Sequence, residues 1–163
     1  MTTPEQVVKA KQLGAVPGFT IGHVLYWGQP FNDHILGAAR AECIDPSVSL
    51  KREGVRFAYH SDSPASPYGP LKYITQGVSR FWQSPLQRKV LDPNERISVD
   101  DAIRAVAIDA AYQLKSNDKI VSLEVGKLAD FVVLEKNPRA TPVEQVADIK
   151  VLQTWVGGKR QDW

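Results

Sequence analysis

The chain has 163 residues, of which 43% are hydrophobic and 23% charged, so its composition is that of an ordinary globular protein with a sizeable core. Twenty basic and eighteen acidic side chains leave a formal net charge of +2. This balance argues against a nucleic acid or a membrane as the main partner, because anionic partners of that kind select strongly basic surfaces.

A single cysteine, Cys43, excludes an internal disulfide, and no motif around it indicates a reactive thiol. The first residues carry neither the basic nor the apolar segment of a secretion signal. The longest apolar runs, such as residues 131–134, are far too short to cross a bilayer. The sequence therefore predicts a soluble, cytoplasmic protein.

The first part of the chain alternates between helical and extended patterns. A capping box, a proline at the first helical position and a closing glycine predict a helix over residues 4–13. Residues 19–27 are rich in β-branched and aromatic side chains, which favours a buried strand. Two further helices are expected, over residues 33–43 and 47–53.

The middle of the chain repeats this alternation. A second strand is predicted over residues 55–59, and three prolines up to position 70 then enforce an irregular loop. Apolar side chains at spacings of three and four predict a helix over residues 71–82. The segment 83–96 is polar with two prolines, so we expect an exposed connection there, and another helix begins near Ser98.

The tail has a different pattern. Residues 129–134 predict a strand, and a second capping box at Thr141 predicts a short helix. A last strand is expected over residues 151–156, and Gly157 and Gly158 turn it into a hairpin.

The order of the elements favours an α/β fold, since strands that alternate with helices usually build a parallel sheet. A complete (β/α)₈ barrel needs roughly 250 residues. This chain therefore has room for only a few units of such a barrel.

The segment around Asp62 is the most informative for chemistry. Strand side chains alternate, so Ala58, His60 and Asp62 share one face while Phe57 and Tyr59 share the other. In a barrel, Asp62 would lie at the carboxyl end of its strand, on the rim where barrel enzymes place catalytic groups. The alternative is that Asp62 merely caps the proline-rich turn, as aspartate often does.

Short motifs follow one another along nearly the whole chain. They are HVLYWG at 23–28, LG at 36–37, RA at 40–41, HSDSP at 60–64, PL at 70–71, VSR at 78–80, ERIS at 95–98, AIRA at 102–105, IDAAY at 108–112, GKLADFVVL at 126–134 and TWVGGK at 154–159. In this order they resemble the end of the barrel and the carboxyl-terminal signature of the amidohydrolase superfamily. The branch they resemble is amidohydrolase family 3, which includes N-acyl-D-amino-acid deacylase-like proteins.

The resemblance implies a domain organisation. Residues 1–115 are expected to form the last two units of a metal-dependent hydrolase (β/α)₈ barrel. Residues 116–163 are expected to contribute strands to a small composite β-sandwich domain.

The resemblance also implies a chemistry. A divalent metal at the barrel mouth, expected to be Zn²⁺, activates a water molecule for attack on a C–N bond, other than a peptide bond, in a small amide-like substrate. Asp62 matches the aspartate that binds metal, accepts the proton of the water and passes a proton to the leaving group. Asp62 is therefore the expected catalytic residue and metal ligand.

Three other residues are candidate substrate contacts, each with an alternative. His23 could face the substrate, or it could be a hydrogen-bonded structural histidine. Trp27 could line the pocket, or it could serve in packing. Arg80 could bind a substrate carboxylate, or it could be solvated or salt-bridged.

The chain also departs from the pattern of the family. The His-x-His pair and the other metal ligands of the earlier strands do not occur, and Gln29 stands where an acidic residue is expected. Because Asp62 alone cannot hold zinc, we expect a carboxyl-terminal piece of an enzyme that is inactive by itself. Open strand edges would then favour self-association. The alternative is a non-catalytic fragment or interaction module.

Overall fold

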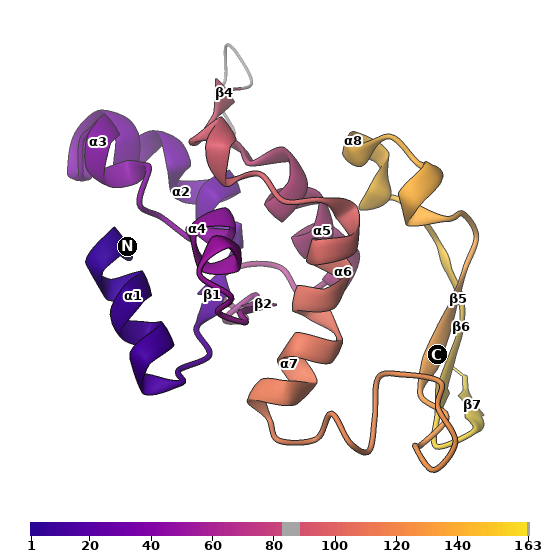
Figure 1. Cartoon of the computed structure of the whole chain (residues 1–163). Helices are drawn as coiled ribbons and strands as arrows, with labels where there is room; N and C mark the ends of the chain where they lie inside the picture. The colour runs from indigo at the N-terminus through magenta and orange to yellow at the C-terminus, as the bar shows by residue number, and fades with distance from the viewer. Residues whose placement is uncertain (83–88, 163) are drawn as a thin grey trace.

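Two short parallel strands form the centre of the part of the molecule that precedes the tail (Figure 1). The computed structural model describes residues 1–82 and 89–162. Strand β1 (Gly18–Thr20) pairs with strand β2 (Ala58–His60), with Phe19 opposite Tyr59. Both aromatic side chains are buried, and the ring of Phe57 lies 6.0 Å from Phe19 and 5.5 Å from Tyr59 between centroids. Since side chains alternate along a strand, this burial fixes which residues face away from the core.

Two of the predicted helices are confirmed. Helix α1 (Pro4–Leu13) starts at the predicted capping box and ends at Gly14, whose φ of 63° is the left-handed conformation that favours glycine. Helix α4 (Ser47–Arg52) lies within the predicted residues 47–53.

The predicted strand over residues 19–27 is wrong beyond its first residues. Strand β1 ends at Thr20, and helix α2 (Gly22–Pro30) follows. Val24 and Gly28, four residues apart, are buried, and a Cβ on Gly28 would come within 2.8 Å of Trp82. Burial of this helical face overrides the extended preference of the branched and aromatic residues, a preference that depends strongly on packing.

The predicted helix over residues 33–43 is replaced by two shorter elements. The π-helix η1 (Phe31–Ile35) continues directly from α2, and helix α3 (Ala38–Ala41) begins after Gly37. Gly37 has a φ of 76°, which interrupts the helical path.

Strand β2 starts later than the predicted residues 55–59, and the next helix ends earlier than predicted. Helix α5 (Pro70–Ser79) stops at Arg80, which has a left-handed φ of 50°. The chain then forms strand β3 (Phe81–Trp82), which pairs antiparallel with β4 (Lys89–Val90).

The expected exposed connection over residues 83–96 is wrong for its second part. Residues 83–88 lie outside the described residues. Beyond β4, Leu91 is buried in the core, and Glu95, in the 3-10 helix η2 (Pro93–Glu95), is buried too. The Glu95 carboxylate accepts hydrogen bonds from the backbone N–H groups of Val48 (2.6 Å) and Ser49 (3.1 Å). It thereby pairs two N–H groups in the first turn of α4 that have no acceptor within the helix.

The helix predicted from Ser98 is present as two pieces. Ser98 caps helix α6 (Val99–Val106) through the N–H of Asp101, and Ala107 separates it from α7 (Ile108–Gln113). Both helices contact β2, and α6 also packs against α5. None of the described helices is long and apolar enough to cross a membrane.

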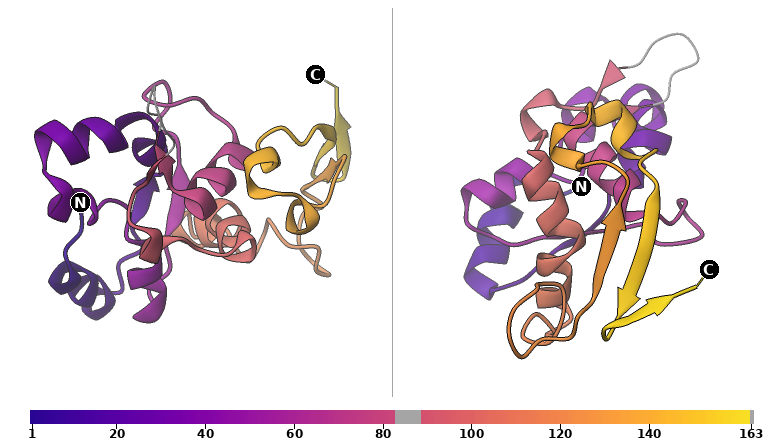
Figure 2. Two further views of the ribbon diagram at one scale, coloured as in Figure 1. Left: turned by 90° about the horizontal axis from the view of Figure 1, so that it is seen from above. Right: turned by 90° about the vertical axis from the view of Figure 1, so that its right-hand side faces the viewer.

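The predicted strands, short helix and hairpin of the tail are confirmed, but the predicted capping box at Thr141 is wrong, because the Thr141 hydroxyl donates to the carbonyl oxygen of Asn137 instead. Strands β5 (Phe131–Leu134), β6 (Val151–Val156) and β7 (Lys159–Gln161) form an antiparallel sheet in the order β5-β6-β7. The 3-10 helix η3 (Pro138–Ala140) and helix α8 (Val143–Val146) connect β5 to β6. Helix α8 packs against α5, and the sheet runs down one flank of the molecule (Figure 2).

A buried guanidinium connects three segments of the core. Arg80 is fully buried and donates hydrogen bonds to the carbonyl oxygens of Ile44 (2.8 Å), Asp45 (2.9 Å) and Leu91 (2.7 Å). The end of α5 is thereby fixed to the segment before α4 and to the segment after β4. Each of these bonds involves a charged donor in a dry environment, where such bonds are strong and costly to lose.

Asp45 brings a buried carboxyl group to the same cluster. Its Oδ2 atom has no hydrogen-bond partner among the described residues, and the side chain is nearly inaccessible. Burial raises the pKa of Asp45 to about 7, although the positive charge of Arg80 opposes this shift. Between pH 4 and 7 the folded chain therefore binds a proton that the unfolded chain has released.

We predict that Asp45 destabilises the fold as the pH rises. Because the proton is held more tightly in the folded state, the free energy of unfolding should fall through this range by up to about 4 kcal/mol and then level off. Asp45→Asn removes the titrating carboxyl group. Urea unfolding should therefore show that the variant becomes more stable relative to the parent chain between pH 5 and 8. Asp118→Asn, at an exposed carboxylate, controls for the loss of one charge. A stability difference for Asp45→Asn that does not change with pH would contradict the prediction.

The β5-β6-β7 sheet leaves apolar side chains in solvent. Three of these side chains are more than half exposed: Val132, Leu152 and Val156. Val132 pairs with Thr154, and residues two apart on a strand lie on one face, so Val132 and Val156 share a face of the sheet. The outer strand β7 carries Lys159 and Arg160, whereas residues 131–134 of the other outer strand carry no charge. Uncharged apolar edges recruit further chains.

We therefore predict that the isolated chain self-associates through this sheet. Sedimentation velocity should show an average mass that rises with protein concentration. The double substitution Val132→Lys and Val156→Lys should shift the chain to monomer, while Val8→Lys, at an exposed position of α1, should not. A concentration-independent monomer for the parent chain would show the prediction to be wrong.

Candidate functional site

The carboxyl ends of β1 and β2 lie side by side because the two strands are parallel and in register. The chain leaves β1 directly into α2, which places His23 in the first turn of that helix. It leaves β2 at His60, two residues before Asp62. In open α/β sheets ligands bind outside the carboxyl ends of the strands, so these three residues define the candidate site.

Asp62 is exposed and has no hydrogen-bond donor to its carboxylate among the described residues. Its φ of 52° is left-handed, a conformation that aspartate tolerates, and its carbonyl oxygen accepts a hydrogen bond from the N–H of Ala65 at 2.7 Å. The turn is thus closed by backbone atoms. Within the described part of the chain, the carboxylate makes no hydrogen bond that would support a role as a turn cap.

The start of α2 packs against the loop that carries Asp62. The Ser66 hydroxyl donates a hydrogen bond of 2.7 Å to the carbonyl oxygen of Ser61, and both side chains are buried. A Cβ on Gly22 would lie 2.6 Å from the Ser66 Oγ atom, closer than any side chain allows. The glycine therefore lets His23 and the Asp62 loop approach each other.

His23 is half-buried and interacts electrostatically with the other two residues. Burial lowers its pKa below the usual value, the negative charge of Asp62 opposes this shift, and the chain's amino group and His60 add to it. The imidazole is therefore neutral at pH 7, with one donor and one acceptor nitrogen. A neutral histidine beside a carboxylate can orient a polar substrate group or a water molecule.

Trp27 lies one helical turn beyond His23 and leaves 48% of its surface exposed. The Trp27 ring contacts the ring of Phe31 at 6.3 Å between centroids, and the His23 ring meets the Phe31 ring edge-on, also at 6.3 Å. Trp27 is therefore only partly used in packing. Sequence reasoning placed His60 on the strand face of Asp62 but did not name it as a site residue, and it missed Phe31. The spacing of Phe31, eight residues after His23, becomes meaningful only once the segment is known to be helical.

The candidate substrate contact at Arg80 needs a correction. The guanidinium is fully buried and is directed at three backbone carbonyl oxygens. It lacks the exposure needed to reach a substrate, and it is neither solvated nor, among the described residues, salt-bridged, which were the alternatives. Arg80 is a structural residue in this fold, and we leave it out of the proposed site.

The residues present do not form a complete metal site. Within residues 1–82 and 89–162, no group of three or more His, Cys, Asp or Glu side chains is placed to hold a metal ion. A catalytic zinc needs about three protein ligands. Asp62 and the two histidines therefore cannot hold such a metal by themselves.

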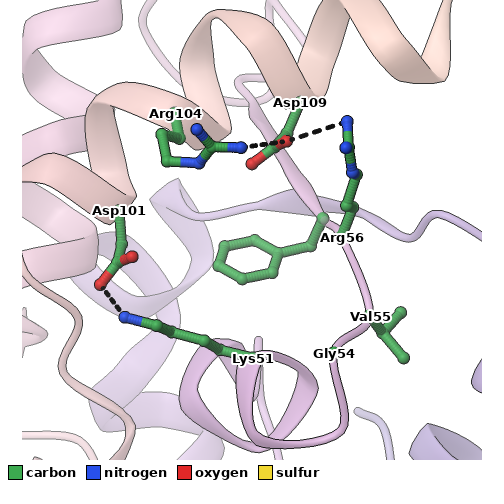
Figure 3. Close-up of a pocket in the computed structure, with 8 residues that line it drawn as sticks. Lys51, Gly54, Val55, Arg56, Asp101, Arg104 and Asp109 are labelled. Carbon is green, nitrogen blue, oxygen red and sulfur yellow. Dashed lines mark hydrogen bonds and ion pairs between the residues drawn. The ribbon is translucent and has the colours of Figure 1, made fainter.

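A hollow of about 190 Å³ lies at the opposite end of β2 (Figure 3). Its charges are paired with one another: Lys51 with Asp101 at 2.6 Å, and both Arg56 and Arg104 with Asp109 at 3.7 and 3.4 Å. These ion pairs join α4, α6, α7 and the segment before β2, so they serve the packing of the fold. We assign no chemistry to this hollow.

Comparisons with known proteins agree with the motifs. The family model described as "Amidohydrolase family" matches residues 1–161. An N-substituted formamide deformylase from Arthrobacter pascens is 29% identical over 146 residues, which are 90% of this chain and 26% of that protein. An imidazolonepropionase from Pseudomonas putida is 33% identical over 118 residues, 71% of this chain and 23% of that protein. The chain thus spans about a quarter of the length of these relatives.

Solved structures match the fold at low sequence identity. An amidohydrolase from Thermotoga maritima superposes with a TM-score of 0.64 at 19% identity, covering 96% of this chain and 34% of that one. An adenosine deaminase from Xanthomonas campestris with bound zinc gives a TM-score of 0.65 at 20% identity, covering 98% and 35%. With the family model matched along nearly its whole length, this mixed α/β chain belongs to the amidohydrolase family, as its family 3 motifs predicted.

Proposed function

We propose that the chain is the carboxyl-terminal part of a metal-dependent amidohydrolase that hydrolyses a C–N bond, other than a peptide bond, in a small amide-like substrate. The observation that carries this proposal is the position of Asp62: an exposed carboxylate without a described hydrogen-bond donor, at the carboxyl end of a parallel strand and coupled to His23. The names of the relatives, a formamide deformylase among them, support an amide-like substrate.

The barrel interpretation follows from the arrangement of the strands. Each of β1 and β2 is followed by a helix, α2 and α5, as in successive units of a (β/α)₈ barrel. In this proposal residues 1–115 are the last two units, and residues 116–163 belong to a small composite β-sandwich. The superposition over about a third of two larger amidohydrolase-fold chains supports it.

Asp62 has the properties of a proton carrier. Its carboxylate can accept a proton from the attacking water and return one to the leaving nitrogen, because it is exposed and makes no described hydrogen bond that would hold it elsewhere. The neutral His23 can orient the substrate through a hydrogen bond. A divalent metal, expected to be Zn²⁺, would supply positive charge beside the scissile carbonyl and a water of lowered pKa. Asp62 is the ligand that this chain offers, and the others would come from protein outside it.

The alternative is a non-catalytic fragment or interaction module. The incomplete ligand set among the described residues is what favours it. Measurements of metal content and turnover, on the chain alone and within an active enzyme, distinguish the hydrolase hypothesis from the non-catalytic one.

We expect the isolated chain to hold no stoichiometric zinc and to show no amidase turnover. The physical reason is that one carboxylate and two histidines outside a ligand cluster cannot retain the metal during purification. Elemental analysis of protein purified without added metal, with an assay on N-acyl amino acids, tests this. One equivalent of zinc together with measurable hydrolysis would mean that the chain assembles its own metal centre.

In an active enzyme that contains this chain, Asp62→Asn should lower kcat by at least about 10²-fold at neutral pH, the low end for the loss of a general base. The substitution keeps the shape of the side chain but removes its proton-accepting charge. Asp118→Asn, at an exposed carboxylate far along the chain from the site, is the matched control and should retain most of the activity. A near-normal kcat for Asp62→Asn would show that Asp62 is only a turn residue.

A further inference from the structure

Three aromatic rings follow one another from the candidate site along α2 and into η1, and the last of them, Phe31, also packs partly against the hydrophobic core. His23, Trp27 and Phe31 follow one another at intervals of four residues, so they lie on one side of the helix. The His23 ring meets Phe31 edge-on at 84°, and the Trp27 ring is tilted by 34° against it. We call these side chains the aromatic ledge.

The ledge is held outward by packing on another side of the same helix. Val24 is fully buried, and Gly28 sits so close to Trp82 that a Cβ would come within 2.8 Å of it. Neither contact leaves the helix free to rotate Trp27 into the core. The 48% exposure of Trp27 is therefore imposed by the fold.

The position of the ledge relative to Asp62 determines what it can bind. His23 follows Gly22, whose close packing against Ser66 holds the start of α2 beside the loop that carries Asp62. Trp27 lies about 6 Å further along the helix axis, given a rise of about 1.5 Å per residue. A substituent on a substrate held at Asp62 and His23 can therefore extend along the helix toward the Trp27 ring.

Chemistry favours an apolar, ring-bearing substituent. Tryptophan and phenylalanine faces bind other aromatic rings through stacked or edge-on contacts, and they gain further from removing apolar surface from water. The three side chains of the ledge carry no carboxylate, ammonium or guanidinium group, so the surface they offer is made of ring faces and ring edges. The π-helix that begins at Phe31 adds to the argument, because such turns occur frequently at functional sites.

We infer that the aromatic ledge is the specificity-determining wall for an aromatic or large apolar substituent of the amide substrate. This inference rests on the proposed function for the identity of the ligand as an amide. It adds a substrate class, and it adds Phe31 as a residue of the binding surface.

The test is binding of two matched amides to this chain. N-(2-phenylethyl)acetamide carries the ring, and N-ethylacetamide lacks it. Nuclear magnetic resonance would follow the indole N–H signal of Trp27 and the ring signals of His23, with the indole of Trp155, in the β5-β6-β7 sheet, as an internal reference. We expect the ring-bearing amide to move the Trp27 and His23 signals but not that of Trp155, and the ethyl amide at equal concentration to move neither.

Substitutions then separate the ledge from general effects on the helix. Trp27→Ala should weaken the affinity for the ring-bearing amide about tenfold, the value of one lost aromatic contact. Trp27→Phe should restore most of it, and Tyr26→Ala, at the neighbouring exposed ring, should leave it unchanged. Circular dichroism of each variant would show whether α2 is retained.

The outcomes are distinct. Equal shifts at Trp27 and Trp155, equal responses to both amides, or an unchanged affinity in a folded Trp27→Ala variant would each overturn the inference. None of these results depends on hydrolysis. If Asp62→Asn lowers kcat in an active enzyme while the ledge fails to distinguish the two amides, the proposed function stands and the ledge does not. If the ledge binds the ring-bearing amide but Asp62→Asn leaves kcat unchanged, the catalytic proposal fails alone.

Discussion

The in-register parallel pairing of β1 with β2 is the constraint on which the candidate site depends. Phe19 and Tyr59 are partners in this pairing, and both are buried on the core side. A slip of one residue would exchange the faces of a strand, which would bury His60 and turn Tyr59 into solvent. The cost of exposing such a large apolar side chain keeps the register. His23 and Asp62 lie at one end of the strands as a consequence.

The polar core supports this arrangement from behind. Arg80 connects the end of α5 with the segment before α4, and Glu95 closes the amino-terminal end of α4. The Ser47 hydroxyl hydrogen-bonds the hydroxyl of Tyr59 at 2.7 Å, so the buried end of a β2 side chain is fixed as well. Polar groups that are buried in this way stabilise one arrangement, because any other would leave them without partners.

Sequence patterns predicted the elements whose signals are local. The capping box before α1 and the glycine pair between β6 and β7 specify their structures within a few residues. Residues 19–27 were misassigned because branched and aromatic side chains favour strands. The helix is stabilised instead by a contact between Gly28 and Trp82, 54 residues away along the chain. For the site, motif resemblance indicated Asp62, His23 and Trp27. The structural role of Arg80 and the place of Phe31 depend on tertiary contacts that no local pattern contains.

One strand register places His23 and Asp62 at the same end of the two strands while the aromatic core face stays buried. Nuclear Overhauser contacts between the backbones of β1 and β2 in the isotope-labelled chain measure that register directly. The account predicts contacts between Phe19 and Tyr59 and between Thr20 and His60. Contacts displaced by one residue, such as Phe19 with His60, would contradict it, because the two strands would then not end side by side before His23 and Asp62.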